Sequence, residues 1–184
     1  VVAKKHFDAD FDTLRELLAS PYHEYRLTAL LALTYRYAKF KDLASREACV
    51  NFYVSQVDAI NNWDLVDLSC YKILGHWLFD KDKQLLYDWA KEDHLWKQRI
   101  AMITCMHFVK QGEFKDALAI ADKLGELGGN YDNSTVFLCH GDCIEDAKYV
   151  ENILKTKYGV KEVLINYTGA VIGSHSGPGT MAVF

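Results

Sequence analysis

The chain has 184 residues, of which half are apolar and a quarter are charged, a composition typical of a globular protein with one or two domains. Its formal net charge of −4 excludes a strongly basic nucleic-acid-binding domain, so any affinity for DNA has to come from local clusters of Lys and Arg. No apolar run reaches the ~20 residues that a bilayer span needs, which argues against membrane insertion.

The N-terminal residues and the cysteines indicate a cytoplasmic chain. The segment 1–6 lacks the apolar region of a signal peptide and an initiator Met, which favours a processed, trimmed or engineered piece. The cysteines are odd in number and most lie within apolar patterns, so we expect reduced core thiols rather than a disulfide framework. They are Cys49, Cys70, Cys105, Cys139 and Cys143.

Apolar residues recur at three- and four-residue spacing over most of the chain, which predicts amphipathic helices. Pro21 and Pro178 are the only prolines, so the stretch between them lacks the strongest helix breaker. The breaks in the pattern are short, which favours antiparallel neighbours. The predicted helices span residues 9–19, 22–39, 43–59, 63–78, 82–92, 95–110 and 113–127.

These helices also show an internal repeat. The segment 24–30 resembles 97–103, and each is followed by a second helix after a turn that contains Lys and Asp. The alignment places Arg26, Asp67 and Arg99 at corresponding positions, at offsets near the ~40-residue period of HEAT-like repeats. We therefore predict a mainly α fold, a HEAT-like antiparallel helical repeat array that presents these residues on a concave surface.

The pattern changes at Gly125–Asn133, where three glycines and Asn130 mark a helix end. We predict a helical repeat segment at 1–128, a linker at 129–134 and a small α/β segment at 135–184. Within the last segment we expect a strand at 134–139, a helix at 143–158 and a strand at 161–166, which form one right-handed βαβ unit. Residues 170–172 and 180–184 are candidates for short strands.

Trp63 and Asp67 are four residues apart and share one face of a predicted helix. A large aromatic ring and a carboxylate on one concave face form a plausible site. The alternative is structural: Trp63 simply packs against its neighbours, and Asp64 interacts with the positive end of the helix dipole.

Three segments together resemble the AlkD-type DNA alkylation repair enzymes, in the order found in that family, over about residues 12–124. They are Ser20–Arg26, Trp63–Asp67 and Leu95–Arg99. The resemblance implies an array that binds double-stranded DNA and excises cationic N3- and N7-alkylated purines. It implies catalytic roles for Asp67 and Trp63 and contacts to DNA from Arg26, Trp96 and Arg99.

The chemistry implied for this site needs no cofactor and no metal. An alkylated purine is already cationic, so it leaves without a general acid, and the sugar gains positive charge. A carboxylate at Asp67 would stabilise that charge and orient a water molecule. Trp63 would form an aromatic wall, and Arg26 and Arg99 would hold phosphates. No deep base-flipping pocket is implied, unlike in most glycosylases.

The sequence also departs from this family. Its first helices are missing before Asp12, and its second site tryptophan, in a Gly-Trp…Leu-Arg-Glu pattern, has no counterpart after Leu124. One side of the predicted site and part of the predicted DNA-binding surface are therefore missing, and we expect impaired activity.

The segment from about 135 to 184 resembles the C-terminal end of DegV-type fatty-acid-binding proteins. The resemblance rests on His140-Gly141-Asp142 and on the string Gly173–Thr180, which contains His-Ser-Gly-Pro-Gly. It implies that His175, with Ser176 and Gly177, lies near the carboxylate of a fatty acid. The alternative is a tight structural turn with an exposed histidine.

Three further interpretations concern the remaining features. The Cys139-x3-Cys143 spacing lacks the second pair of ligands that structural zinc needs, so we predict no metal site. His76 and His107 lie within helical patterns and are expected to be satisfied core or boundary residues. Two partial resemblances in one chain also leave open a non-catalytic scaffold, a natural fusion, a deletion product or an engineered chimera.

Overall fold

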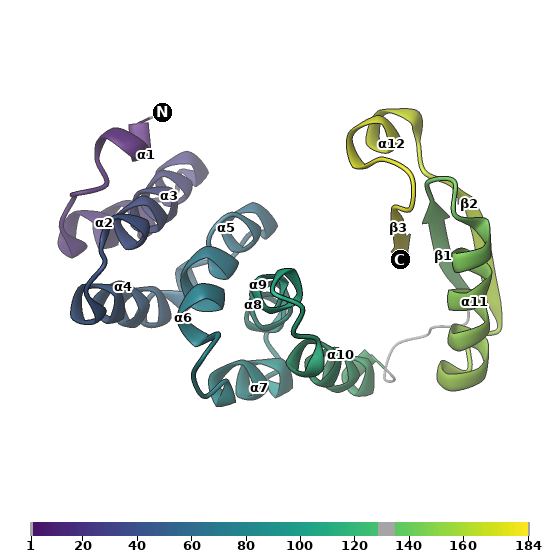
Figure 1. Ribbon diagram of the computed structural model, residues 1–184. Coiled ribbons are helices and arrows are strands. Elements are labelled where there is room, and N and C mark those ends of the chain that lie inside the picture. The colour runs from purple at the N-terminus through teal and green to yellow at the C-terminus, as the bar shows by residue number, and fades with distance from the viewer. Residues whose placement is uncertain (1, 129–134, 184) are drawn as a thin grey trace. The chain divides into compact units, whose positions relative to one another are not determined.

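The computed structural model describes residues 2–128 and 135–183, which form two compact units, Val1–Glu126 and Leu127–Phe184. The first consists of helices and the second contains a three-stranded sheet, as expected of a mainly α chain with a small α/β segment (Figure 1). The predicted linker at 129–134 lies outside the described residues. Within the described ranges, every helix is too short or too polar to cross a membrane.

The first unit is a succession of short helices packed side by side in chain order (Figure 1). Its α-helices are α1 (Val2–Lys5), α2 (Phe11–Leu18), α3 (His23–Lys39), α4 (Leu43–Ser55), α5 (Trp63–Asp67), α6 (His76–Leu78), α7 (Gln84–Lys91), α8 (Leu95–Thr104), α9 (Met106–Lys110) and α10 (Lys115–Gly128). A 3-10 turn, η1 (Val57–Ala59), follows α4, and a π-helical segment, η2 (Tyr71–Gly75), precedes α6. The closest helix pairs are α2 with α3 and α7 with α8, as expected for stacked helical hairpins.

One continuous apolar core runs through this unit. The fully buried side chains come from successive helices, so each helix pair buries its apolar stripe against the next pair. The largest of them are Tyr53, Phe108, Leu14, Leu30, Leu33, Ile60, Leu65, Ile73, Leu74, Leu86, Ile100 and Ile120. The three cysteines of the unit, Cys49, Cys70 and Cys105, are buried in the same core as free thiols, as the sequence predicted.

Three of the predicted long helices are interrupted, and the one predicted at 43–59 ends at Ser55, before the 3-10 turn η1. The predicted helix at 63–78 is divided into α5, η2 and α6, because the Ser69 hydroxyl donates to the Leu65 carbonyl and competes with the helical hydrogen bonds. The predicted helix at 95–110 is divided into α8 and α9 at Cys105, whose thiol donates to the Ala101 carbonyl at 3.3 Å. The separate helix α5 carries both predicted catalytic residues.

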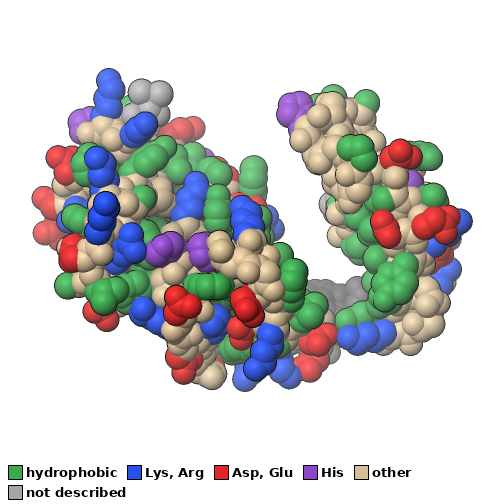
Figure 2. All heavy atoms as spheres, viewed as in Figure 1, with side chains coloured by type: hydrophobic (Ala, Val, Ile, Leu, Met, Phe, Trp, Pro, Cys, Tyr) green, Lys and Arg blue, Asp and Glu red, His purple; other side chains and the backbone are tan. Residues whose placement is uncertain are grey.

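The surface charge of the first unit is mixed. On the face drawn in Figure 2, Lys and Arg side chains are interspersed with Asp and Glu. Some lysines have carboxylate partners, such as Lys97 with Glu92 at 2.7 Å and Lys83 with Asp116 at 3.7 Å. This pairing agrees with the balanced charge of the sequence.

The second unit contains β1 (Thr135–His140), α11 (Ile144–Tyr158), β2 (Glu162–Tyr167), α12 (Ala170–Ser176) and β3 (Met181–Val183). The strand order is β2-β1-β3, with β1 parallel to β2 and antiparallel to β3. The parallel β1-α11-β2 connection confirms the predicted strand–helix–strand unit. Helix α11 ends at Gly159, whose φ of 67° lies in the left-handed region that favours glycine.

The prediction of a strand at 170–172 was wrong, since these residues begin helix α12. The side chains of its last turn bond back to helix carbonyls: Ser174 and His175 contact the Val171 carbonyl at 2.8 Å, and Ser176 donates to the Ile172 carbonyl at 2.8 Å. A three-residue apolar run is too short to distinguish a strand from a helix, which explains the wrong prediction.

Candidate functional site

The predicted catalytic residues lie on a very short helix between two longer ones. Helix α5 contacts both α3 and α8. It begins at Trp63, whose backbone N–H donates to the Asn62 side chain at 2.7 Å, and it ends at Asp67. Leu65 and Val66 are completely buried, so the opposite side of α5 carries the candidate residues.

Asp67 and Arg99 form a bidentate ion pair between α5 and α8. Arg99 donates from Nε to Oδ1 at 2.9 Å and from Nη2 to Oδ2 at 2.7 Å. The side chains are 28% and 38% exposed, respectively, so both remain open to solvent. The hydrogen bonds that Arg99 donates to Asp67 raise the pKa of Arg99. This fork geometry fixes the carboxylate plane and leaves further lone pairs on the same oxygens.

Trp63 lies one helical turn before Asp67 and is 60% exposed. The indole is therefore largely open to solvent rather than enclosed in the core. An exposed aromatic ring and a partly exposed carboxylate share one face of α5, as the spacing predicted.

The other two candidates for DNA contacts have different surroundings. Arg26 donates from Nη1 to the Ser20 and Pro21 carbonyls at 3.1 and 3.4 Å, so it stabilises the turn before α3. Trp96 is partly buried and packs against the core next to Arg99 on α8. The structure thus joins Asp67 to Arg99 but joins neither of them to Arg26 by a described contact.

Sequence reasoning missed one side-chain pair at this site. His23 Nε2 lies 2.7 Å from Asp64 Oδ2 and connects the first turn of α3 to the first turn of α5. Both residues occur in the segments that carry the family resemblance, but they are 41 positions apart, and no periodicity pairs them. Asp64 also accepts from the Leu65 backbone N–H at 2.8 Å, as expected of a carboxylate in the first helical turn.

His107 is a boundary residue of the first unit, as expected, whereas His76 is exposed at its surface. The Tyr37 hydroxyl lies 2.8 Å from His76 Nδ1, and the two imidazole centroids are 5.6 Å apart. Burial lowers the pKa of both histidines and raises the pKa of Tyr37 to about 12. No group of three or more His, Cys, Asp or Glu side chains within 2–128 and 135–183 is arranged to hold a metal ion.

In the second unit, the two glycine-containing strings lie against each other. Gly141 N–H donates to the Thr180 carbonyl at 2.7 Å, and Gly179 N–H donates to the Gly141 carbonyl at 2.7 Å. A Cβ at Gly141 would lie 3.0 Å from the Gly177 carbonyl oxygen, which explains the glycine at this close approach. His140 is buried and stacks near Tyr167, with ring centroids 4.7 Å apart.

His175 is exposed at the end of α12. Its Nδ1 lies 2.8 Å from the Val171 carbonyl, so Nε2 is the ring nitrogen directed to other partners. Ser176 is also bound within the helix, and Gly177 follows it with a positive φ of 81°. These residues therefore form a helix end rather than an extended ligand loop.

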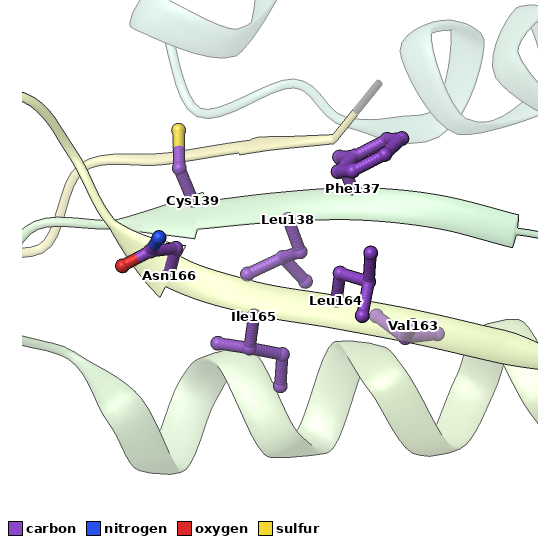
Figure 3. Close-up of a pocket in the computed structure, with 7 residues that line it drawn as sticks. All are labelled: Phe137, Leu138, Cys139, Val163, Leu164, Ile165 and Asn166. Carbon is purple, nitrogen blue, oxygen red and sulfur yellow. The ribbon is translucent and has the colours of Figure 1, made fainter.

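The sheet of this unit has one covered and one open face. Along β1, Val136, Leu138 and His140 are buried, whereas Phe137 is 56% exposed. Figure 3 shows Ile165 directed toward a helix, with Phe137 and Cys139 on the opposite side of the sheet. A shallow groove of about 520 Å³ is lined by Phe137, Leu138, Cys139, Val163, Leu164, Ile165 and Asn166. His175 is not among these lining residues.

Comparisons with known proteins find two families, whose matches overlap at residues 107–126 within the first unit. Residues 1–126 match the family described as DNA alkylation repair enzyme, and residues 107–184 match the uncharacterised DegV family. A DegV domain-containing protein of Clostridium perfringens is 51% identical over 74 residues, which are 40% of this chain. The chain spans about a quarter of the length of this curated relative, since the match covers 25% of it. No solved structure matches the chain.

Proposed function

Because the chain belongs to the DNA alkylation repair enzyme family over residues 1–126 and carries a DegV domain at residues 107–184, we propose that its helical unit acts on alkylated double-stranded DNA. The reaction is hydrolysis of the N-glycosidic bond of purines that carry a positive charge after alkylation at N3 or N7. Asp67 is the proposed catalytic carboxylate, and Trp63 is its aromatic neighbour.

The observation that carries this proposal is the position of Asp67. Its carboxylate is partly exposed and held in a fixed plane by Arg99, with the Trp63 indole exposed on the same short helix. A preorganised carboxylate stabilises positive charge where it develops, and here that place is the sugar of the departing nucleotide. The alkylated base leaves as a neutral purine, so the site needs no acid to protonate it.

Arg99 has two proposed functions. In the free protein it holds Asp67, and on DNA its guanidinium is close enough to the candidate site to contact a phosphate of the lesion strand. Arg26 keeps two of its hydrogen bonds within the turn at Ser20 and Pro21. We therefore assign Arg26 a mainly structural contribution to DNA binding and Arg99 a direct one. Trp96 lies on α8 one helical turn before Arg99.

The test is release of N7-methylguanine from duplex DNA under single-turnover conditions. We expect slow but measurable release by the wild type, because the family's second tryptophan pattern has no counterpart in this chain. Asp67→Asn keeps the size of the side chain and removes the charge, and it should lower the rate by about 10²–10³-fold. Asp58→Asn, at a carboxylate that is 85% exposed, is the matched control and should retain the wild-type rate.

Two outcomes would reject the proposal. One is the absence of release by the wild type at any protein concentration. The other is equal release by wild type and Asp67→Asn, which would mean that the carboxylate has no part in the reaction. Binding of the same duplex, measured by fluorescence anisotropy, separates a loss of affinity from a loss of chemistry.

A second candidate function concerns the DegV domain. The open apolar groove beside Phe137 and Leu164 favours binding of an acyl chain, although His175, the expected partner of the carboxylate, does not line this groove. Native mass spectrometry of the protein purified from cells should then show a retained fatty acid. Leu164→Arg, which places a charge in the groove, should abolish retention, and a mass without ligand for the wild type would exclude this function.

A further inference from the structure

Helix α5 is too short to maintain its own conformation. It has five residues, whereas isolated helices below about 12 residues are marginal in water. Its position therefore depends on what its side chains contact. Leu65 and Val66 anchor one side in the core, and the orientation of the exposed side depends on polar contacts.

Two polar contacts hold α5 from opposite neighbours. Asp67 at its end is bound to Arg99 of α8, and Asp64 near its beginning is bound to His23 of α3 at 2.7 Å. The His23 and Asp64 side chains are only 31% and 18% exposed, so water competes weakly for this bond. Asp64 is also fixed by the Leu65 N–H at 2.8 Å. The contact with α3 is thus the more buried of the two.

We propose that His23 is a positioning residue that, through Asp64, holds the first turn of α5 and hence the Trp63 indole while Asp67 acts on the substrate. This inference rests on the proposed function of Asp67. In that reaction Asp67 directs lone pairs to the sugar and Arg99 also contacts a phosphate, so the contact between α5 and α8 is shared with the substrate. The His23–Asp64 bond includes neither reacting group and remains intact.

The geometry also assigns the donor of this bond. His23 Nδ1 is buried, with no hydrogen-bond partner among the described residues, whereas Nε2 faces the carboxylate. A neutral imidazole with its proton on Nε2 donates to Asp64 and leaves an acceptor, not an N–H, in the buried position. The function of His23 therefore requires a donor at the place of Nε2.

This requirement distinguishes two conservative variants. In His23→Gln the side-chain amide nitrogen reaches the place of Nε2, so it can donate to Asp64. In His23→Asn the amide is one methylene shorter and reaches only the place of Nδ1. If His23 had only a structural role, the two variants should have similar effects, because both replace the ring by a polar amide.

The first measurement is the Trp63 indole N–H resonance in a two-dimensional ¹H–¹⁵N spectrum, assigned with Trp63→Phe. We expect the chemical shift of this resonance to be that of the wild type in His23→Gln, and the signal to be shifted or broadened in His23→Asn. Asp64→Ala removes the acceptor from the other side and should reproduce the His23→Asn spectrum. Glu24→Gln, next to His23 on the exposed side of α3, is the control that should change nothing.

The second measurement is single-turnover release of N7-methylguanine by the same variants. His23→Asn should lower the rate by about ten- to a hundredfold, as for a displaced catalytic geometry, and His23→Gln should restore it to within about twofold of the wild type. An unchanged Trp63 signal in both His23→Asn and Asp64→Ala overturns the inference, as does an equal loss of rate in His23→Gln and His23→Asn. If the wild type releases no base, the proposed function fails, and the spectra alone decide whether His23 positions Trp63.

Discussion

Gly75 should not tolerate a methyl group, because it lies where η2 packs against the α8–α9 junction. A Cβ at this position would lie 2.6 Å from His107 Cβ and 2.8 Å from the Thr104 carbonyl oxygen. Ordinary contacts begin near 3.4 Å, so in Gly75→Ala the segment has to move away from α8 and α9 by somewhat less than about 1 Å.

The expected loss of stability follows from two opposing contributions. Overpacking of this kind costs about 1–3 kcal/mol, and replacement of glycine by alanine within a helix gains about 0.5–1 kcal/mol. The net effect is a decrease of about 1–2 kcal/mol in the free energy of unfolding, or roughly 3–8 °C in Tm. Because η2 follows α5 in the chain, the same movement should loosen the Asp67–Arg99 pair.

Thermal and urea unfolding followed by circular dichroism measure this change. Gly173→Ala is the matched control, because its nearest neighbour is the Thr168 carbonyl oxygen at 3.8 Å, and it should be neutral or slightly stabilising. His107→Ala should not rescue Gly75→Ala, since alanine retains Cβ and the Thr104 carbonyl stays in place. A Gly75→Ala variant as stable as the wild type would refute the packing argument.

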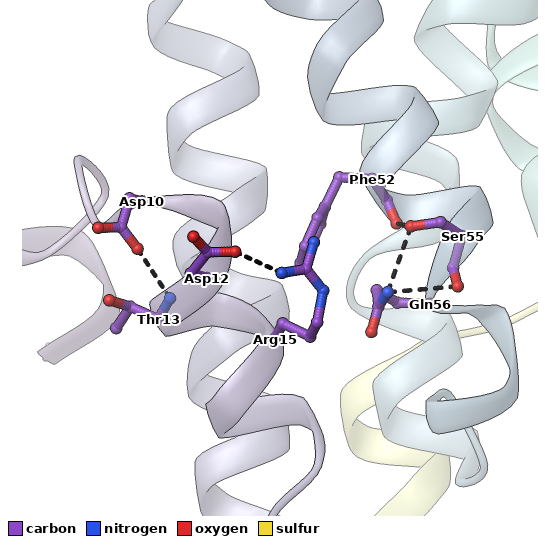
Figure 4. A network of polar contacts seen from close by, with 7 residues as sticks. All are labelled: Asp10, Asp12, Thr13, Arg15, Phe52, Ser55 and Gln56. Atoms are coloured by element: carbon purple, nitrogen blue, oxygen red, sulfur yellow. Dashed lines mark hydrogen bonds and ion pairs between the residues drawn. The ribbon is translucent and has the colours of Figure 1, made fainter.

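Three further predictions concern charges and thiols. The helix N-caps Asp10 and Asp42 accept from the Thr13 and Ser45 N–H groups (Figure 4 for Asp10), which lowers the pKa of both carboxyls. Their stabilisation is therefore present at neutral pH and lost as pH falls below about 4, so Tm should fall less steeply with acid in Asp10→Asn/Asp42→Asn than in the wild type. A double-mutant cycle on Asp67 and Arg99 should give a coupling of about 0.5–1 kcal/mol that decreases in 1 M salt, and a coupling insensitive to salt would contradict the solvent exposure of the pair. A thiol reagent at pH 8 should modify two cysteines rapidly in the native protein and all five after unfolding, because burial raises the pKa of the three core thiols, to about 12 for Cys70 and Cys105. The two reactive thiols should be Cys139 and Cys143.

The local features of this protein could be predicted from its sequence. Apolar spacing over the first two-thirds of the chain, with no proline between Pro21 and Pro178, was sufficient for a helical array. The four-residue spacing of Trp63 and Asp67 was sufficient to place them on one helix face. These predictions succeed because side-chain periodicity depends only on backbone geometry.

Only the tertiary structure determined which side chains the candidate residues contact. Asp67 pairs with Arg99 across 32 positions and His23 with Asp64 across 41, and no local pattern encodes either pair. Likewise, a three-residue apolar run at 170–172 fits a strand or a helix equally well, and the structure places it at the start of α12. Periodicity determines which face of an element is apolar, but which polar groups meet depends on how the elements pack, because a hydrogen bond requires its two partners to lie within about 3 Å of each other.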